Sequence, residues 1–236
     1  MTNSYIALDL ETTGLNPKSE FITEIAALRV EEGQVTGRLV TLVNPGKPLE
    51  ERITQLTGIT DAMLKEAPSM QDIAGEVLSF CSGLPLLGHN VIFDYSFLKQ
   101  TAIDLKIPFE GEALDTLKLC RRFMPAEEKR CLSNACAYYQ IPQPLAHRAE
   151  ADAQSAHLLY QKLMEIYGNE HPESFLPKPL SYSAKRRQPA TKRQKQYLQD
   201  LIKCHRIDIT VHLDSLSRSE ASRLIDKLIL QYGKPV

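Results

Sequence analysis

The sequence contains no tryptophan, no CxxC pair and no long apolar run, and its formal net charge is only -1. The five cysteines leave one thiol over if they pair, and their spacing suits neither a disulfide framework nor a zinc site, so we expect reduced thiols. No stretch approaches the roughly 20 apolar residues of a membrane span, and the first residues, MTNSYIALDL, lack the basic start of a signal peptide. We therefore expect a cytoplasmic protein. The total charge gives no argument for nucleic acid, so any such argument depends on where the charges lie.

The chain of 236 residues is long enough for one sizeable domain and a smaller unit. Alternating apolar residues predict strands at 6–11, 23–30 and 34–43, the last two joined as a hairpin at EEG. Strands at 84–88 and 113–115 then alternate with helices at 69–80, 91–105, 116–124, 131–141 and 149–168. This order predicts an α/β fold with a mixed sheet, an antiparallel meander plus parallel strands, flanked by helices. Any site should lie at the C-terminal edge where the strand order reverses.

The composition changes after residue 168. Residues 169–190 contain several prolines and few large apolar side chains, which is typical of a linker. Residues 191–236 show two short amphipathic stripes at helical spacing. We therefore predict a first domain at 1–168, a basic linker at 169–190 and a small helical domain at 191–236, a possible site for nucleic acid or a partner.

Acidic residues recur at positions expected near that edge of the sheet. Asp9 and Glu11 share one face of the first strand, and Asp94 lies in the first turn of the helix that follows a buried strand. Asp152 falls on a helical face of alanines that carries no Lys or Arg, and a buried carboxylate needs a partner. Each acid also has an ordinary interpretation, because strand faces are often solvated and an acid in a first helical turn can simply answer the helix dipole.

Four carboxylates on three elements suit hard divalent cations, which bind mainly carboxylates and water. A pair of such ions supports displacement at a phosphodiester, where one activates water and the other stabilises the leaving oxygen. His147, just before the helix that carries Asp152, could then accept a proton from water near neutral pH.

Three segments carry a resemblance to a known family. DLETTG, the segment GHNVIFD, and His147 followed five residues later by Asp152 resemble the three motifs of the DEDDh (DnaQ-like) 3′-5′ exonucleases, a family that includes the proofreading subunit of bacterial DNA polymerase III. The resemblance runs over roughly residues 4–166 and includes LTGITDAMLKEAP. It implies a ribonuclease-H-like fold, a general base at His147 and two Mg²⁺ or Mn²⁺ ions. The metal ligands that it implies are Asp9, Glu11, Asp94 and Asp152.

The resemblance also implies a substrate site. Thr12, Thr13 and Leu15 would line the pocket for the terminal nucleotide, with backbone amides of the TTG turn near the 3′ hydroxyl. Asn90 and Phe93 would lie close to the scissile phosphate and sugar. One departure is visible, because many relatives carry two adjacent aspartates in the last motif and here Ala151 precedes Asp152. Since the family's ligand is the second of the pair, we expect catalysis to survive.

Several neighbouring residues have structural interpretations. We expect His89 to be structural, His157 to lie on another side of its helix, and Asp115 to cap the helix that it precedes. Tyr138 and Tyr139 end a helix, and we expect them in the core and at its rim rather than in a base-stacking platform.

A basic cluster lies in and just after the linker and consists of Lys185, Arg186, Arg187, Lys192, Arg193 and Lys195. Such a run can be a solvated tether. Alternatively it supplies salt-dependent contacts to phosphates, which an acidic site that repels DNA would need.

These observations predict a metal-dependent 3′-5′ exonuclease that releases nucleoside 5′-monophosphates from DNA 3′ ends. A 3′-5′ exoribonuclease and a non-catalytic module that only holds 3′ ends are the alternatives. The expected partner is nucleic acid with a free 3′ end, with a possible polymerase or clamp partner for the C-terminal tail and no membrane. The sequence leaves proofreading, repair and end-trimming open.

Overall fold

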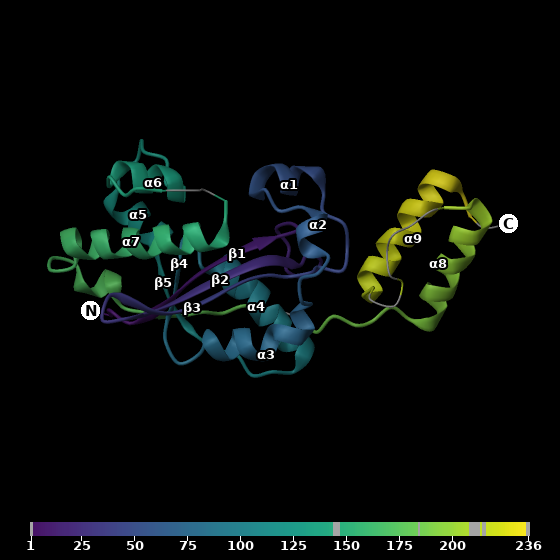
Figure 1. Ribbon diagram of the computed structural model, residues 1–236, viewed down its shortest axis with the longest axis horizontal. Coiled ribbons are helices and arrows are strands. Elements are labelled where there is room, and N and C mark those ends of the chain that lie inside the picture. Colours follow the sequence, from purple (N-terminus) through teal and green to yellow (C-terminus); the bar gives the residue numbers. More distant parts are fainter. Residues whose placement is uncertain (1, 144–146, 184, 208–212, 214–215, 235–236) are drawn as a thin grey trace.

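The computed structural model describes residues 2–143, 147–183, 185–207, 213 and 216–234. Its centre is a six-stranded mixed sheet in the order β3-β2-β1-β4-β5-β6 (Figure 1). β1 pairs antiparallel with β2 and parallel with β4, so the central strand β1 is the point where the strand order reverses. The predicted mixed sheet is confirmed. The strands are β1 Tyr5–Thr12, β2 Ile22–Glu31, β3 Gln34–Leu42, β4 Leu86–Gly88, β5 Glu112–Asp115 and β6 Lys178–Pro179.

The predicted alternation along β1 separates two cores. Ala7 packs in a cluster with α7 (Ala149–Tyr167) and with α5 (Thr116–Phe123) and α6 (Leu132–Tyr138). Ile6 and Leu8 point the other way and pack against α3 (Met70–Phe80) and α4 (Ile92–Leu105). The face that carries Asp9 and Glu11 is therefore covered by α7, not open to solvent along its length.

Local signals place most of these elements. Ser69 and Asp72 form the capping box that starts α3, and Glu32 and Gly33 take positive φ values of 50° and 81° in the hairpin between β2 and β3. Two further helices, α1 (Glu51–Thr57) and α2 (Asp61–Leu64), were not predicted. They are too short to show a helical period in the sequence.

The segment after α7 is more ordered than a tether. A 3-10 helix, η1 (Pro172–Phe175), buries the Phe175 ring against Phe123 and Tyr160, and β6 then adds an antiparallel edge to β5. The chain thus packs on the sheet well beyond residue 168 before it turns toward the C-terminal helices.

Two capped helices form the C-terminal unit, α8 (Lys192–His205) and α9 (Arg218–Tyr232). They pack on each other through a cluster of their own around Leu198, Leu201 and Leu228, apart from the two cores of the sheet (Figure 1). No helix among the described residues is both long enough and apolar enough to cross a membrane.

All five cysteines are free thiols. Cys81, Cys120 and Cys136 are buried, as expected of small apolar side chains. Cys131 is exposed and precedes α6 as its N-cap residue.

Candidate metal centre

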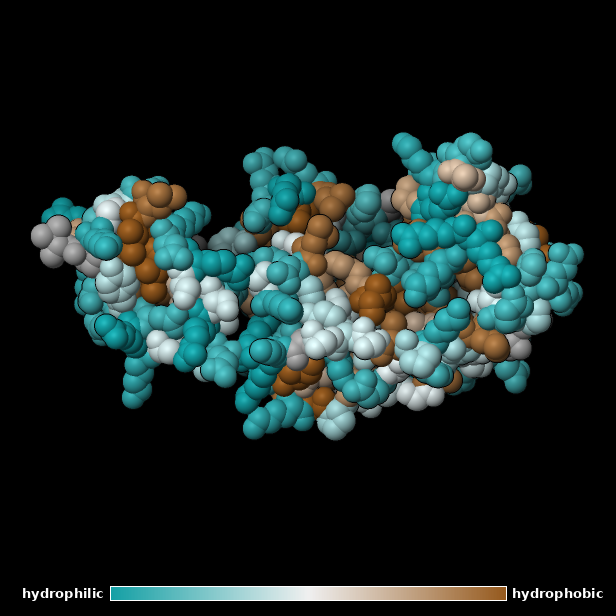
Figure 2. All heavy atoms as spheres, turned by 180° about the vertical axis from the view of Figure 1, so that it is seen from behind, coloured by the Kyte–Doolittle hydropathy of each residue, from teal (hydrophilic) through white to brown (hydrophobic). Residues whose placement is uncertain are grey.

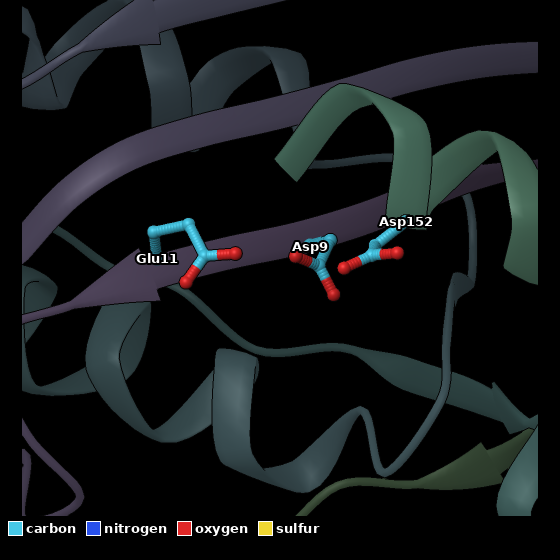
Figure 3. Close-up of side chains that lie close together, drawn as sticks. All are labelled: Asp9, Glu11 and Asp152. Atoms are coloured by element: carbon cyan, nitrogen blue, oxygen red, sulfur yellow. The ribbon is translucent and has the colours of Figure 1, made fainter. Parts of the chain in front are cut away.

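Three acidic side chains converge at the carboxyl end of β1. Asp9 and Glu11 extend from β1 and Asp152 from the first turn of α7, and one carboxylate oxygen of each lies within 4.8 Å of the others. Figure 3 shows Asp9 and Asp152 side by side with Glu11 farther along the strand. The spacing of two along β1 keeps the first two on one face, and α7 crosses that face.

Asp94 approaches the same place from the opposite side of the sheet. It is buried in the first turn of α4, and its Oδ1 accepts a hydrogen bond from the Leu10 backbone N–H at 3.1 Å. It lies outside the group of three, but its charge acts on Asp9. All four predicted acids therefore lie at one edge of the sheet.

The cluster resists ionisation. Burial, followed by the charges of Asp94, Asp152 and Glu11, raises the pKa of Asp9 well above its usual value. Burial and the Asp152 charge raise the pKa of Glu11 to about 7, although Arg148 opposes this. Burial also raises the pKa of Asp94 and of Asp152. Closely spaced carboxylates that resist ionisation are a favourable binding site for a divalent cation, which would relieve their repulsion.

Glu24 and Arg148 are site residues that the sequence patterns did not single out. Glu24 lies opposite Glu11 in the β1–β2 register, and only 2% of it is exposed. Both oxygens of its carboxylate accept hydrogen bonds from the Arg148 guanidinium, at 2.6 to 3.2 Å, and one also accepts the Ala149 N–H at 3.0 Å. The sequence offered one signal for Glu24, an acid inside the apolar run TEIAALRV. Its partner Arg148 lies 124 residues away, so the pair could not be recognised from the sequence.

His147 lies exposed at the entrance to α7, immediately before Arg148. It adopts a left-handed backbone with φ of 64°, and its N–H donates to Asp152 Oδ2 at 3.0 Å. The bonds from Arg148 and Ala149 to Glu24 fix the chain just beyond it. The residue is therefore held beside the acidic cluster by its backbone, while its ring stays accessible to solvent.

The residues of the expected nucleotide pocket lie at the end of β1 and in the turn that follows it. The Thr13 hydroxyl donates to Glu20 Oε2 at 2.6 Å, and its N–H donates to the Phe21 carbonyl at 2.8 Å, so this amide is already used within the loop. The Thr12 hydroxyl donates to the Gly14 carbonyl. Leu15 differs from both, because 85% of this large apolar residue is exposed.

Asn90 and Phe93 lie at the start of α4. Asn90 is exposed in a left-handed conformation with φ of 75°, and its N–H donates to Asp115 Oδ1 at 3.1 Å. The Phe93 ring is half-buried against Phe97, with ring centroids 5.1 Å apart. Asp115 also caps α5 through the N–H groups of Leu117 and Lys118, as predicted.

The residues expected to be structural have partners that explain them. His89 bonds the Thr116 hydroxyl and the Arg130 carbonyl, and burial lowers its pKa. His157 is buried on α7 with its Nδ1 at 3.0 Å from the Tyr5 hydroxyl. Tyr139 is buried in the core and Tyr138 is exposed at its rim. Among the residues described, neither histidine belongs to the three-acid group.

Sequence comparison identifies the chain's relatives. The RNase T family of exonucleases matches residues 6–160. The DNA polymerase III subunit epsilon of Aquifex aeolicus is 34% identical over 166 residues, which cover 70% of this chain and 82% of that protein. The PolC-type DNA polymerase III of Caldanaerobacter subterraneus subsp. tengcongensis is 32% identical over 165 residues. That match covers 70% of this chain but only 12% of the much longer polymerase.

Solved structures share the architecture. Exonuclease X in complex with 5′ overhanging duplex DNA has a TM-score of 0.53 at 25% identity, covering 68% of this chain and 91% of that one. Escherichia coli exonuclease I in complex with a dT13 oligonucleotide has a TM-score of 0.63 at 18% identity, covering 73% of this chain and 43% of that one. The second likeness concerns the fold, which is that of ribonuclease-H-like exonucleases.

Proposed function

The chain belongs to the DnaQ-like RNase T family of 3′-5′ exonucleases, which are phosphodiester hydrolases, and from this premise we propose that it removes nucleoside 5′-monophosphates from the 3′ ends of DNA with the help of two divalent cations. The observation that carries the proposal is the group formed by Asp9, Glu11 and Asp152, with Asp94 beside it.

The donor set fits Mg²⁺ or Mn²⁺. Hard cations prefer carboxylate oxygens, and after burial the charges of the neighbouring acids raise the pKa of Asp9 and of Glu11, a repulsion that a cation would relieve. We assign the ligand role to these four residues, which would hold the cations. When bound, the cations supply charge stabilisation for the attacking water and the leaving oxygen.

The chain's own residues supply the base. His147 is exposed and its backbone N–H is bonded to Asp152, so we assign its imidazole the role of accepting a proton from the attacking water as the bond to phosphorus forms. The reaction breaks the bond from phosphorus to the 3′ oxygen of the preceding nucleotide, and that oxygen leaves with a proton. This leaves a 5′-monophosphate as the product.

Substrate residues are assigned around the same edge. The exposed Leu15 offers an apolar surface to the terminal base, while Thr12 and Thr13 shape the turn that carries it. Asn90 and Phe93 at the start of α4 are assigned to the phosphate and sugar. The DNA bound in the exonuclease X structure favours DNA over RNA as the substrate.

A digestion assay tests the proposal. Purified protein is incubated with matched 5′-labelled single-stranded DNA and RNA oligonucleotides in Mg²⁺, Mn²⁺ or EDTA. We expect a metal-dependent ladder that shortens from the 3′ end on DNA, and loss of that ladder in Asp9→Ala.

Glu150→Ala is the matched control. Glu150 is also an acid in the first turn of α7, but it pairs with Arg38 at the surface. Its variant should keep the ladder. Preferential digestion of RNA would overturn the DNA assignment, and no cleavage of either polymer would favour the binding module.

A further inference from the structure

Two residues of the basic cluster around the linker, Arg186 and Arg187, bind other parts of the chain. The Arg187 N–H donates to Asp104 Oδ1 at 2.6 Å, and the guanidinium lies 3.3 Å from Asp104 Oδ2 and 4.7 Å from the centre of the Phe21 ring. Arg186 donates to the Asp104 carbonyl. These two cations therefore attach the linker to the end of α4, so this part of the cluster is not a free tether.

Arg187 also contacts the loop that follows β1. Its Nη2 donates to the Pro17 carbonyl and, at 3.2 Å, to the Glu20 carbonyl. The side chain thus joins α4, the linker and the loop that carries Leu15. This junction fixes the start of the helical unit beside the loop.

A groove lies between this loop and the first two turns of α9. Its loop side consists of Asn16, Lys18 and Ser19, and its α9 side consists of Arg218, Ser219, Ser222 and Arg223. Three of these seven residues are cationic, none is acidic, and all three cations are exposed. Hydrophilic side chains border the junction between the helical unit and the sheet domain in Figure 2.

The cations of the groove have little internal compensation. Among the described residues, neither Lys18 nor Arg218 forms an ion pair, and Arg223 has only a longer-range interaction with Glu20, which Lys47 already binds at 2.6 Å. Arg218 occupies the first position of α9, where a positive charge opposes the helix dipole. Like charges brought together from two parts of the chain repel each other, so their position is better explained by an anionic ligand than by stability.

We propose that this groove binds the sugar-phosphate backbone of the single strand whose 3′ end occupies the acidic site. The inference rests on the proposed function and names the strand's path. Lys18 lies three residues after Leu15, so the loop that carries Leu15 also forms one side of the groove. Arginine, lysine and serine side chains contact phosphates without reading bases, so the groove should hold strands of any sequence.

Binding in EDTA tests the groove independently of hydrolysis. The anisotropy of a 5′-labelled 12-nucleotide single-stranded DNA is measured at several salt concentrations for the full chain and for Arg218→Glu/Arg223→Glu. We expect at least a tenfold loss of affinity at low salt. The slope of log affinity against log salt should fall in magnitude by about 1.4, which is roughly 0.7 for each phosphate that the variant no longer neutralises. Glutamate is favourable near a helix N-terminus, so the substitution should leave α9 folded.

Two further variants make the result specific. Lys203→Glu/Lys234→Glu makes the same change in charge at α8 and beyond the far end of α9, outside the groove, and should keep the salt slope. Lys18→Glu lies on the loop and should lower the slope by about 0.7 without depending on the helical unit.

Equal losses of affinity in the groove and control variants, or an unchanged slope in Lys18→Glu, would overturn the proposal. Normal binding by a wild-type chain that fails to cleave would instead count against the proposed function alone.

Discussion

Glu11 and Glu24 lie opposite each other on β1 and β2, yet their environments differ. Glu24 is almost completely buried and has a bidentate partner in Arg148. Glu11 faces Asp9 and Asp152, and its pKa is raised to about 7, chiefly by burial and then by Asp152. The β1–β2 pair thus carries two different acids. The charge of Glu24 is compensated by Arg148, whereas Glu11 lies mainly among other acids.

This difference separates structural acids from candidate ligands better than burial does. A buried carboxylate with an internal cation is satisfied, and a metal would gain little there. A group of buried carboxylates that has no internal cation destabilises the folded chain, and binding of a metal cation removes this cost. The same reasoning applies to the basic residues: Arg187 forms an ion pair with Asp104, while Lys18 and Arg218 form none among the residues that the structure describes.

The largest expected effect comes from removing charge at the centre of the acidic group. Asp9→Asn should lower kcat by at least about 10²–10³-fold, because it removes a metal ligand, while raising the melting temperature in EDTA at pH 8. The gain in stability should be about 1 kcal/mol, since the variant removes repulsion. Thermal unfolding and a digestion assay on one preparation measure both. A variant that is both inactive and less stable in EDTA would contradict the comparison.

The stability difference between Asp9→Asn and the wild type should depend on pH. The sign of this dependence follows from the raised pKa of Asp9 in the folded state. Below the unfolded pKa of about 3.9, Asp9 is protonated in both states, and the variant and wild type should be equally stable. As the pH rises, the wild type loses stability because its folded state resists ionisation, so the advantage of Asp9→Asn should grow. Saturating Mg²⁺ should stabilise the wild type and reduce that advantage.

A smaller effect on turnover is expected at His147. This residue lies just before Arg148, the partner of Glu24, and five residues before Asp152. His147→Ala should lower kcat by about 10²-fold, the lower end of the contribution of a general base, with little change in KM, because a general base acts on the reaction rather than on binding. His157→Gln on the same helix is the control, because that ring contacts the buried Tyr5 hydroxyl. It should lower the melting temperature and keep kcat. An equal loss of kcat in both variants would refute the assignment.

The last comparison is between two variants whose unfolding free energies are measured. Arg148→Ala leaves the Glu24 carboxylate buried with a single N–H partner and should cost about 2–3 kcal/mol of unfolding free energy. Arg38→Ala removes an ion pair to Glu150 that is exposed on both sides, and should cost at most about 1 kcal/mol. Urea denaturation of both variants checks this. Similar losses of stability would show that Glu24 is less dependent on its partner than the geometry indicates.

Much of the fold follows from local patterns. The alternation along 6–11, 23–30 and 34–43, the capping box at Ser69 and the helical stripe before Gly168 predicted their elements closely. The helices α1 and α2 and the edge strand β6 were missed, because four to seven residues show little period and two strand residues show none. Phe175 gave no sign that it packs on the sheet, since a single apolar residue in a proline-rich segment has no pattern.

The sequence by itself determined which residue types could bind a metal, because the strand period puts Asp9 and Glu11 on one face and three ordered motifs resemble one enzyme family. Only the tertiary structure decided which charges are already compensated. Glu24 and Arg148 are 124 residues apart and Arg187 and Asp104 are 83 apart, so their pairing depends on strand register and on the packing of α7 and the linker. The chain sets the charge of each residue, but compensation of that charge requires distant residues to meet.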